Sequence, residues 1–321
     1  MKGIYCDNKS LSSQGYCSYY GETFYSLKSV LDVEYKQMSP SKISDIGNCD
    51  YIILGYGHTD CGHDAPKQIV NDTNIPVFSI INKEYASLKQ KLAWVKNMRA
   101  TAAFSAHHDV DKFMSETAIP FYRTMWSANE ELFKDYGGDY KHDLFFSGVT
   151  RPDQSDNLRE KVLSELHRLN GELGNFINVR SHRNNYAGTM FTDDEYARHL
   201  SDSKLCLVTT GPADLVGTRF FEIFAGNRSL VICNRMSEKI YDDMIIDGVN
   251  CVMFSTVDEF YEKAQYYLDN EDERMRIVNN AYKIFKDRLT WSYRAKKIEN
   301  IVGGYCGCLL YTSPSPRDFV R

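Results

Sequence analysis

KLCLVTTGPADLVGTRFFEIFAGNRSLVICN, residues 204–234, contains the pattern that decides the fold. An apolar run of strand length leads through a loop with glycine and proline into a segment with helical spacing, and a second apolar run follows. Strand, helix and strand in this order are typical of a parallel βαβ unit. The sequence therefore predicts an α/β fold.

The same alternation extends over both halves of the chain. Strand-like runs lie at 2–6, 30–36, 50–57, 75–81 and 100–106, and then at 143–148, 175–179, 204–210, 229–234 and 251–254. The polar, glycine-containing stretch 126–143 separates the two series. We therefore expect two Rossmann-like doubly wound domains, at 1–128 and 143–288, joined by a linker at 129–142. Since parallel sheets bind ligands at the carboxyl ends of their strands, both domains are expected to face a shared cleft.

Composition excludes several classes of function. The 321 residues are 43% hydrophobic and 25% charged, as in a soluble globular protein, and the formal net charge of −5 disfavours nucleic acid as a partner. No apolar run approaches the ~20 residues of a transmembrane segment. The nine cysteines form no C-x-x-C pair, and the N-terminus lacks a secretory signal, so a cytoplasmic location is expected.

The end of the chain has a different character. CLLYTSPSPRD, residues 308–318, resembles a translated sequencing adapter. We therefore expect 308–321 to be an artefactual tail on an environmental, metagenomic sequence, with 289–307 as the last genuine helix.

A charged pair inside the apolar stretch quoted above indicates a binding site. Arg219 and Glu222 lie three positions apart, so they share one face of the predicted helix. The helix begins near Gly217 and Thr218, where free N–H groups and the helix dipole favour a diphosphate. A guanidinium fits phosphate oxygens, and a carboxylate accepts sugar hydroxyls. The alternative is a plain ion pair on the surface of the helix.

Four segments resemble a known family. TRFFEIFAG (218–226), SLVICNR (229–235), DGVNCVMFSTVDEF (247–260) and DERMRIVNNAYKIFKDRLTWSYR (272–294) are similar to the C-terminal half of the spore-maturation-protein group of GT-B glycosyltransferases, a group 1-like type. The resemblance covers roughly residues 143–302. It implies a metal-independent glycosyltransferase with a nucleoside-diphosphate sugar as donor, an unknown acceptor and no cofactor. It also implies that helix 289–307 crosses back to the N-terminal domain.

The resemblance also assigns donor-binding residues. It implies that Glu222 binds the ribose, that Arg219 binds the diphosphate, and that Gly148 with Arg151 meets the opposite face of the phosphates. Asp214 stands where relatives often carry a second acidic residue, but it could equally cap the helix. Asn227 stands where relatives carry glycine, so it is expected to adopt a left-handed conformation.

Two histidine-rich loops leave alternatives open. His107 and His108 follow the run 100–106 and are candidates for the catalytic base or for a contact to the transferred sugar. With Asp109 and Asp111 they could instead bind a metal, or Asp109 or Asp111 could simply cap a helix. The loop with His58, Asp60 and His63 offers a second candidate metal cluster, an acceptor-binding loop or a solvated loop.

Three functions remain after these considerations. The first is a glycosyltransferase in which Arg219 and the histidines are catalytic. The second is a GT-B module that binds a nucleotide or glycan without turnover. The third is a metal-dependent hydrolase that uses His58, Asp60 and His63, or His107 and Asp109.

Overall fold

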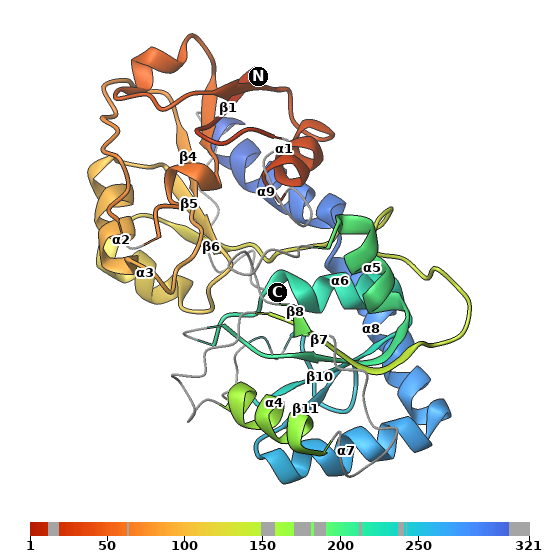
Figure 1. Ribbon diagram of the computed structural model, residues 1–321. Coiled ribbons are helices and arrows are strands. Elements are labelled where there is room, and N and C mark those ends of the chain that lie inside the picture. Colours follow the sequence, from red (N-terminus) through yellow and green to blue (C-terminus); the bar gives the residue numbers. More distant parts are fainter. Residues whose placement is uncertain are drawn as a thin grey trace. The chain divides into compact units, whose positions relative to one another are not determined.

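The computed structural model describes residues 1–11, 19–62, 64–148, 158–169, 181–182, 191–211, 214–236, 241 and 243–307. The chain divides into two compact units, Met1–Trp126 with Trp291–Arg321, and Ser127–Thr290. Each unit contains one parallel sheet with helices packed on it (Figure 1). The predicted α/β class is confirmed. The predicted strand 175–179 and tail 308–321 lie outside the described residues.

The first unit is built on a parallel sheet with the strand order β2-β1-β3-β4-β5-β6. Its strands are β1 (Gly3–Asp7), β2 (Val33–Gln37), β3 (Tyr51–Leu54), β4 (Val77–Ile80), β5 (Ala102–Ser105) and β6 (Phe121–Arg123). Its helices are α1 (Tyr19–Lys28), η1 (Ile43–Ile46), η2 (Tyr56–His58), α2 (Leu88–Asn97), α3 (Val110–Thr117) and α9 (Trp291–Gly307). The five predicted strands of this half are therefore confirmed, whereas β6 was missed.

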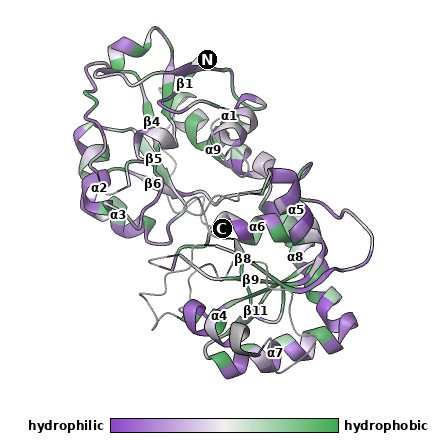
Figure 2. Ribbon diagram, in the orientation of Figure 1, coloured by the Kyte–Doolittle hydropathy of each residue, from purple (hydrophilic) through white to green (hydrophobic). Residues whose placement is uncertain are grey.

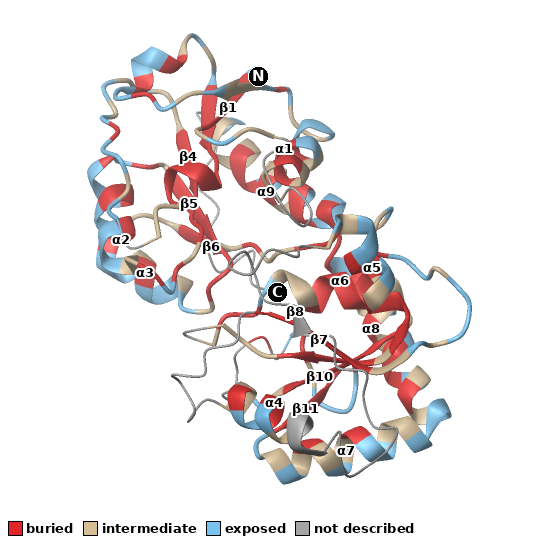
Figure 3. Cartoon of the chain, in the orientation of Figure 1, coloured by how far each residue is buried: buried red, intermediate tan, exposed pale blue. Residues whose placement is uncertain are grey.

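Both faces of this sheet are buried under helices. Alternate residues of β1 point to opposite faces, so Ile4 packs in a core with α2 and α3, while Tyr5 packs in a core with α1 and α9. Figure 3 shows β4 and β5 as buried along their length, and Figure 2 shows their hydrophobic character. Burial on two faces explains why these strands appear in the sequence as continuous apolar runs.

The second unit repeats the plan with the parallel order β11-β10-β9-β7-β8. Its strands are β7 (His142–Ser147), β8 (Ser181–His182), β9 (Ser203–Val208), β10 (Leu230–Asn234) and β11 (Val252–Phe254). Its helices are α4 (Leu158–Leu169), α5 (Asp193–Ser201), α6 (Thr218–Gly226), α7 (Val257–Asp269) and α8 (Glu271–Arg288). Helices α4, α7 and α8 share one apolar core with the sheet. Among the described helices of the chain, none combines the length and apolarity needed to cross a membrane.

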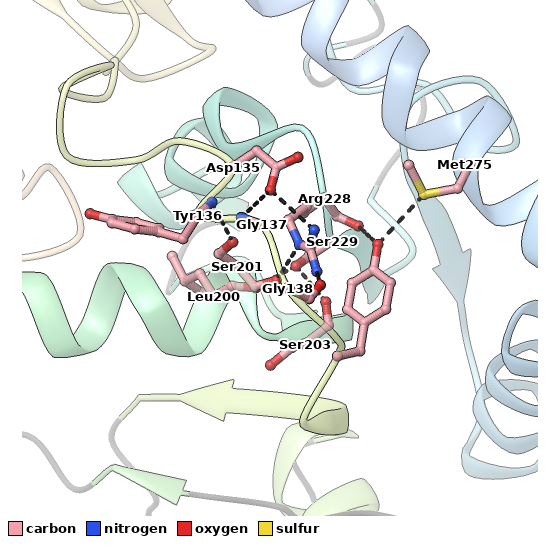
Figure 4. Close-up of polar contacts among 11 residues, drawn as sticks. Asp135, Tyr136, Gly137, Gly138, Leu200, Ser201, Ser203, Arg228, Ser229 and Met275 are labelled. Atoms are coloured by element: carbon pink, nitrogen blue, oxygen red, sulfur yellow. Dashed lines mark hydrogen bonds and ion pairs between the residues drawn. The ribbon is translucent and has the colours of Figure 1, made fainter.

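The segment that precedes β7 is fastened to this unit by Arg228 (Figure 4). The guanidinium donates from Nε to the Ser201 carbonyl at 2.9 Å, from Nη1 to Asp135 Oδ1 at 3.1 Å and from Nη2 to the Gly138 carbonyl at 2.6 Å. It also lies 4.4 Å from the centre of the Tyr140 ring, a cation–π distance. Residues 135–140 are thus held on the second unit.

Helix α6 ends on a left-handed residue, as the sequence predicted. Asn227 is its C-cap, with φ of 51° and ψ of 36°. This conformation costs most residues about 1 kcal/mol or more, and asparagine and glycine adopt it most easily. The chain then turns directly into β10, so Asn227 sets the connection between helix and strand.

We predict that Asn227→Gly leaves the free energy of unfolding unchanged within about 0.5 kcal/mol, whereas Asn227→Ala lowers it by about 1 kcal/mol. Urea unfolding followed by circular dichroism measures both. Asn279→Ala, the same change at an exposed position inside α8, serves as the control and is expected to cause no loss. An equal effect at both sites would contradict the assignment of strain to Asn227.

Candidate functional site

Polar side chains gather where β9 and β10 end in the second unit. Arg159, in the first turn of α4, donates from Nε to Thr209 Oγ1 at 2.5 Å and from Nη2 to the Thr210 carbonyl at 3.4 Å. Its guanidinium also lies 6.0 Å from the centre of the Phe146 ring. A cation is therefore held beside the carboxyl end of β9, the edge at which parallel sheets bind ligands.

The loop after β9 is fixed by Asn234 at the end of β10. Asn234 Oδ1 accepts the Thr210 N–H at 2.7 Å, and its Nδ2 donates to Thr210 Oγ1 at 3.0 Å. Thr210 Oγ1 in turn lies 3.4 Å from Asp214 Oδ1, to which it donates. Asp214 has φ of +54°, and the N-cap of α6 is Gly217, so Asp214 does not cap the helix. Its carboxylate belongs to the strand-end loop.

Helix α6 begins as predicted, with Gly217 as N-cap and Thr218 as first residue. Arg219 is partly exposed in the first turn, whereas Glu222 is buried, with 2% of its surface exposed. The Tyr196 hydroxyl of α5 donates to Glu222 Oε2 at 2.7 Å. The pKa of Tyr196 is raised by burial and by the charge of Glu222, and Arg219 opposes this rise. Both charges therefore lie near Tyr196, on the side of α6 that faces α5.

The remaining donor residues of the sequence prediction follow β7. Gly148 comes directly after this strand, and a Cβ at its position would lie 2.9 Å from Cζ of the Phe146 ring. A side chain there would displace the ring against which Arg159 packs. Arg151 lies outside the described residues. Arg159, which the sequence prediction missed, stands in the first turn of the helix after this strand, where its guanidinium and the free N–H groups of the helix start can meet the same anion.

In the first unit, His107 and His108 follow β5. The two rings stack with their centres 4.2 Å apart, and His107 Nδ1 accepts the Asp109 N–H at 3.0 Å. Asp109 occupies the N-cap position of α3, the helix-start alternative in the sequence prediction, although its side chain makes no capping hydrogen bond, and Asp111 lies in the first turn. Possible ligand atoms of His107, His108 and Asp109 lie within 4.8 Å of one another. The N-terminal end of a helix, however, disfavours a cation.

The loop after β3 uses its polar groups for internal contacts. His58 is buried and its Nε2 lies 3.2 Å from the Cys6 carbonyl, to which it donates. Burial lowers the pKa of His58 to about 4, so the ring is neutral at pH 7. Asp60 accepts the Tyr20 hydroxyl and forms an ion pair with Lys83. His63 lies outside the described residues.

A buried carboxyl group at the end of β1 was missed by the sequence prediction. Asp7 is 1% exposed and accepts the N–H groups of Lys9 at 2.9 Å and of Gly57 at 3.3 Å. A Cβ at either Gly55 or Gly57 would lie 2.0 Å from an Asp7 carboxylate oxygen. The two glycines of the G-Y-G stretch therefore make room for this carboxyl group, and they were the available signal in the sequence.

Comparisons with known proteins agree on the fold. Residues 158–300 match the family model "Glycosyl transferase-like", somewhat under half of the chain. The structure is similar to that of Anabaena Alr3699/HepE in complex with UDP-glucose, with a TM-score of 0.60, 10% identity, and 94% of this chain and 99% of that chain covered. The chain has the GT-B glycosyltransferase fold.

Two other solved structures give the same result. Sucrose-phosphate synthase from Thermosynechococcus elongatus matches with a TM-score of 0.60 at 8% identity, over 94% of this chain and 98% of that chain. A glycosyltransferase from Rickettsia africae matches with a TM-score of 0.60 at 12% identity, over the same shares of the two chains. No curated protein sequence matches the chain.

We predict that Asp7 makes the first unit less stable as the pH rises. Burial raises the pKa of Asp7 to about 6, although the N–H groups of Lys9 and Gly57 oppose the rise. A folded-state pKa above the unfolded value stabilises the fold below pH ~4, and this stabilisation is lost as the pH passes about 6. The loss amounts to about 3 kcal/mol, and Asp7→Asn should abolish it.

Tryptophan fluorescence measures this change in the first unit, because Trp94, Trp126 and Trp291 all belong to it. Urea unfolding between pH 4 and 7 is compared for the wild type and Asp7→Asn. Other titrating groups affect both proteins equally, so the difference in slope belongs to Asp7. Equal slopes would show that Asp7 is already charged in the folded protein at pH 5.

Proposed function

We propose that the protein transfers a sugar from a nucleoside-diphosphate sugar to an acceptor, without a metal ion. The observation that carries the proposal is the position of Arg159, held against Thr209 and Thr210 at the carboxyl end of β9. This position lies within the segment that matches a glycosyl transferase-like family model. The similar HepE structures contain UDP and UDP-glucose, which supports a UDP-sugar as the first donor to test.

The proposed chemistry is stabilisation of the departing diphosphate. When the bond between the sugar and the diphosphate breaks, negative charge grows on the phosphate oxygens. Guanidinium groups and helix N-termini stabilise such charge without a metal. We assign this task to Arg159 and Arg219, with the start of α6 at Gly217 and Thr218, and Arg151 remains a further candidate. Asp214 and Gly148 border the same strand ends.

Glu222 is proposed as the group that binds the ribose. Its carboxylate already accepts a hydroxyl donor, from Tyr196, which supports its fitness to accept sugar hydroxyls. Because Glu222 is buried, ribose binding requires its carboxylate to turn away from Tyr196. Tyr196→Phe removes the competing donor, so it is expected to keep or strengthen nucleotide binding, whereas Glu222→Gln should weaken it. The narrower resemblance to the spore-maturation-protein group stays a prediction.

We predict that UDP raises the melting temperature of the wild type and that Arg159→Gln weakens UDP binding by about 10- to 100-fold. Loss of a charged hydrogen bond to phosphate costs about 1.5–3 kcal/mol, which corresponds to this range. Isothermal titration with UDP, GDP, ADP and TDP measures the affinities. Arg276→Gln on α8, whose guanidinium pairs with Glu273, is the matched control and should bind like the wild type. Wild-type affinity in Arg159→Gln would overturn the assignment.

Turnover separates the transferase from its alternatives. Release of free UDP from UDP-glucose, slow with water and faster with an acceptor, supports transfer. Nucleotide binding without release at any acceptor favours the binding module. Elemental analysis of the purified protein tests the hydrolase, because a metal at His107, His108 and Asp109 should co-purify and be lost in His108→Ala.

A further inference from the structure

The loop after β5 is held by a buried glutamate. Glu84, just after β4, has 4% of its surface exposed. Its Oε1 accepts the Ser105 hydroxyl at 2.6 Å and the Ala106 N–H at 3.2 Å. Both donors belong to the end of β5, so one carboxyl oxygen joins the ends of two neighbouring strands. A buried carboxyl group with two such donors is costly to remove.

A second hydrogen bond connects Ser105, and thereby Glu84, to the backbone of His107. Ser105 Oγ accepts the His107 N–H at 3.0 Å. A hydroxyl group has a single proton, and Ser105 gives it to Glu84, so its lone pairs remain for His107. The hydrogen bonds therefore run in one direction, from the His107 backbone through Ser105 to Glu84.

The loop that carries Glu84 is itself fixed, by a fully buried lysine. Lys91 of α2 donates from Nζ to the carbonyl of Asn82 at 2.6 Å and to that of Lys83 at 2.8 Å. Lys83 has φ of +53°, a turn that these two contacts hold in place. Glu84 follows directly, so its position is determined from both sides.

The tautomer of His107 follows from its hydrogen bond. Because Nδ1 accepts the Asp109 N–H, Nδ1 carries no proton, and the neutral ring carries its proton on Nε2. The opposite tautomer would place two N–H donors against each other. Burial and the neighbouring His108 lower the pKa of His107 to about 4, Lys112 acts in the same direction, and Asp109 opposes it. At pH 7 the ring is neutral, with Nε2–H as its donor.

We propose that Glu84 is a positioning residue that, through Ser105, holds the backbone of His107 where the ring accepts the Asp109 N–H at Nδ1 and therefore donates through Nε2–H. In the transfer reaction, and therefore resting on the proposed function, His107 then donates to an oxygen of the substrate instead of taking the proton of the acceptor. A base at Nε2 would need the tautomer that the Asp109 N–H opposes. Of the two roles that the sequence left open for His107, this geometry favours the contact and disfavours the base.

Nitrogen NMR of the histidine rings tests the proposal without any sugar nucleotide. His107→Gln identifies the His107 signals among the eight histidines of the chain. In the wild type we expect the proton on Nε2. In Glu84→Ala we expect a mixture of tautomers. Glu84→Gln keeps an acceptor oxygen and should behave like the wild type.

Controls make each result decisive. Glu116→Ala removes an exposed acid from α3 and should leave the His107 signals unchanged. If Glu84→Ala does not fold, Ser105→Ala replaces it, because it cuts the connection to His107 while the carboxyl group remains. A proton on Nδ1 in the wild type would overturn the proposal. An unchanged tautomer in the folded variant that lacks the connection would overturn it as well.

The enzymatic part of the test separates this proposal from the proposed function. UDP release should fall by about tenfold or more in Glu84→Ala and recover in Glu84→Gln, since small displacements of a positioned group reduce rates strongly. The affinity for UDP should stay unchanged in both variants. A protein that neither binds nor cleaves UDP-sugars would overturn the proposed function and the substrate contact of His107. The NMR result would still support or contradict the positioning role of Glu84, because it does not depend on sugar nucleotides.

Discussion

In each sheet the strands run parallel and are covered by helices on both faces, and this constraint determines where chemistry can occur. Most side chains along β4, β5 and β10 are apolar because these strands are buried. Polar groups gather mainly where strands end. Asp7, Glu84 and His107 in the first unit, and Thr210 and Asn234 in the second, all lie at carboxyl ends of strands. The candidate sites of both units follow from this rule.

Burial also determines what these polar groups do. Asp7, Glu84 and Glu222 are three carboxyl groups with almost no exposed surface, and each accepts N–H or O–H donors of the protein. Burial of a carboxyl group without such donors would cost several kcal/mol. Burial thus makes Asp7 and Glu84 parts of the scaffold, whereas Glu222 is the proposed ribose ligand. The cations act differently, because Arg159 and Arg219 retain exposed surface and therefore the ability to meet an anion.

The sequence predicted the features that depend on local pattern. Apolar runs located nine of the described strands. Asn227 stands where relatives carry glycine, and its left-handed conformation was predicted correctly from this position. Strand β6 has only three residues and no alternation, so its pattern was too short to detect. Asp7, Glu84 and Arg159 were missed because their partners lie 50, 21 and 50 positions away in the chain. Such contacts leave no periodic signal. Arg151 and His63 lie outside the described residues, and their roles remain predictions.

Helix α9 has a consequence for how the chain is made. Its residues Ile298, Ile301 and Val302 share one core with Tyr5 and Phe24 from the beginning of the chain. During translation, all residues of the second unit, which is continuous in sequence, are therefore synthesised before the first unit can complete its core. The first unit keeps part of one apolar sheet face uncovered until α9 has been translated. Chaperone demand during synthesis should accordingly fall on the half that emerges first.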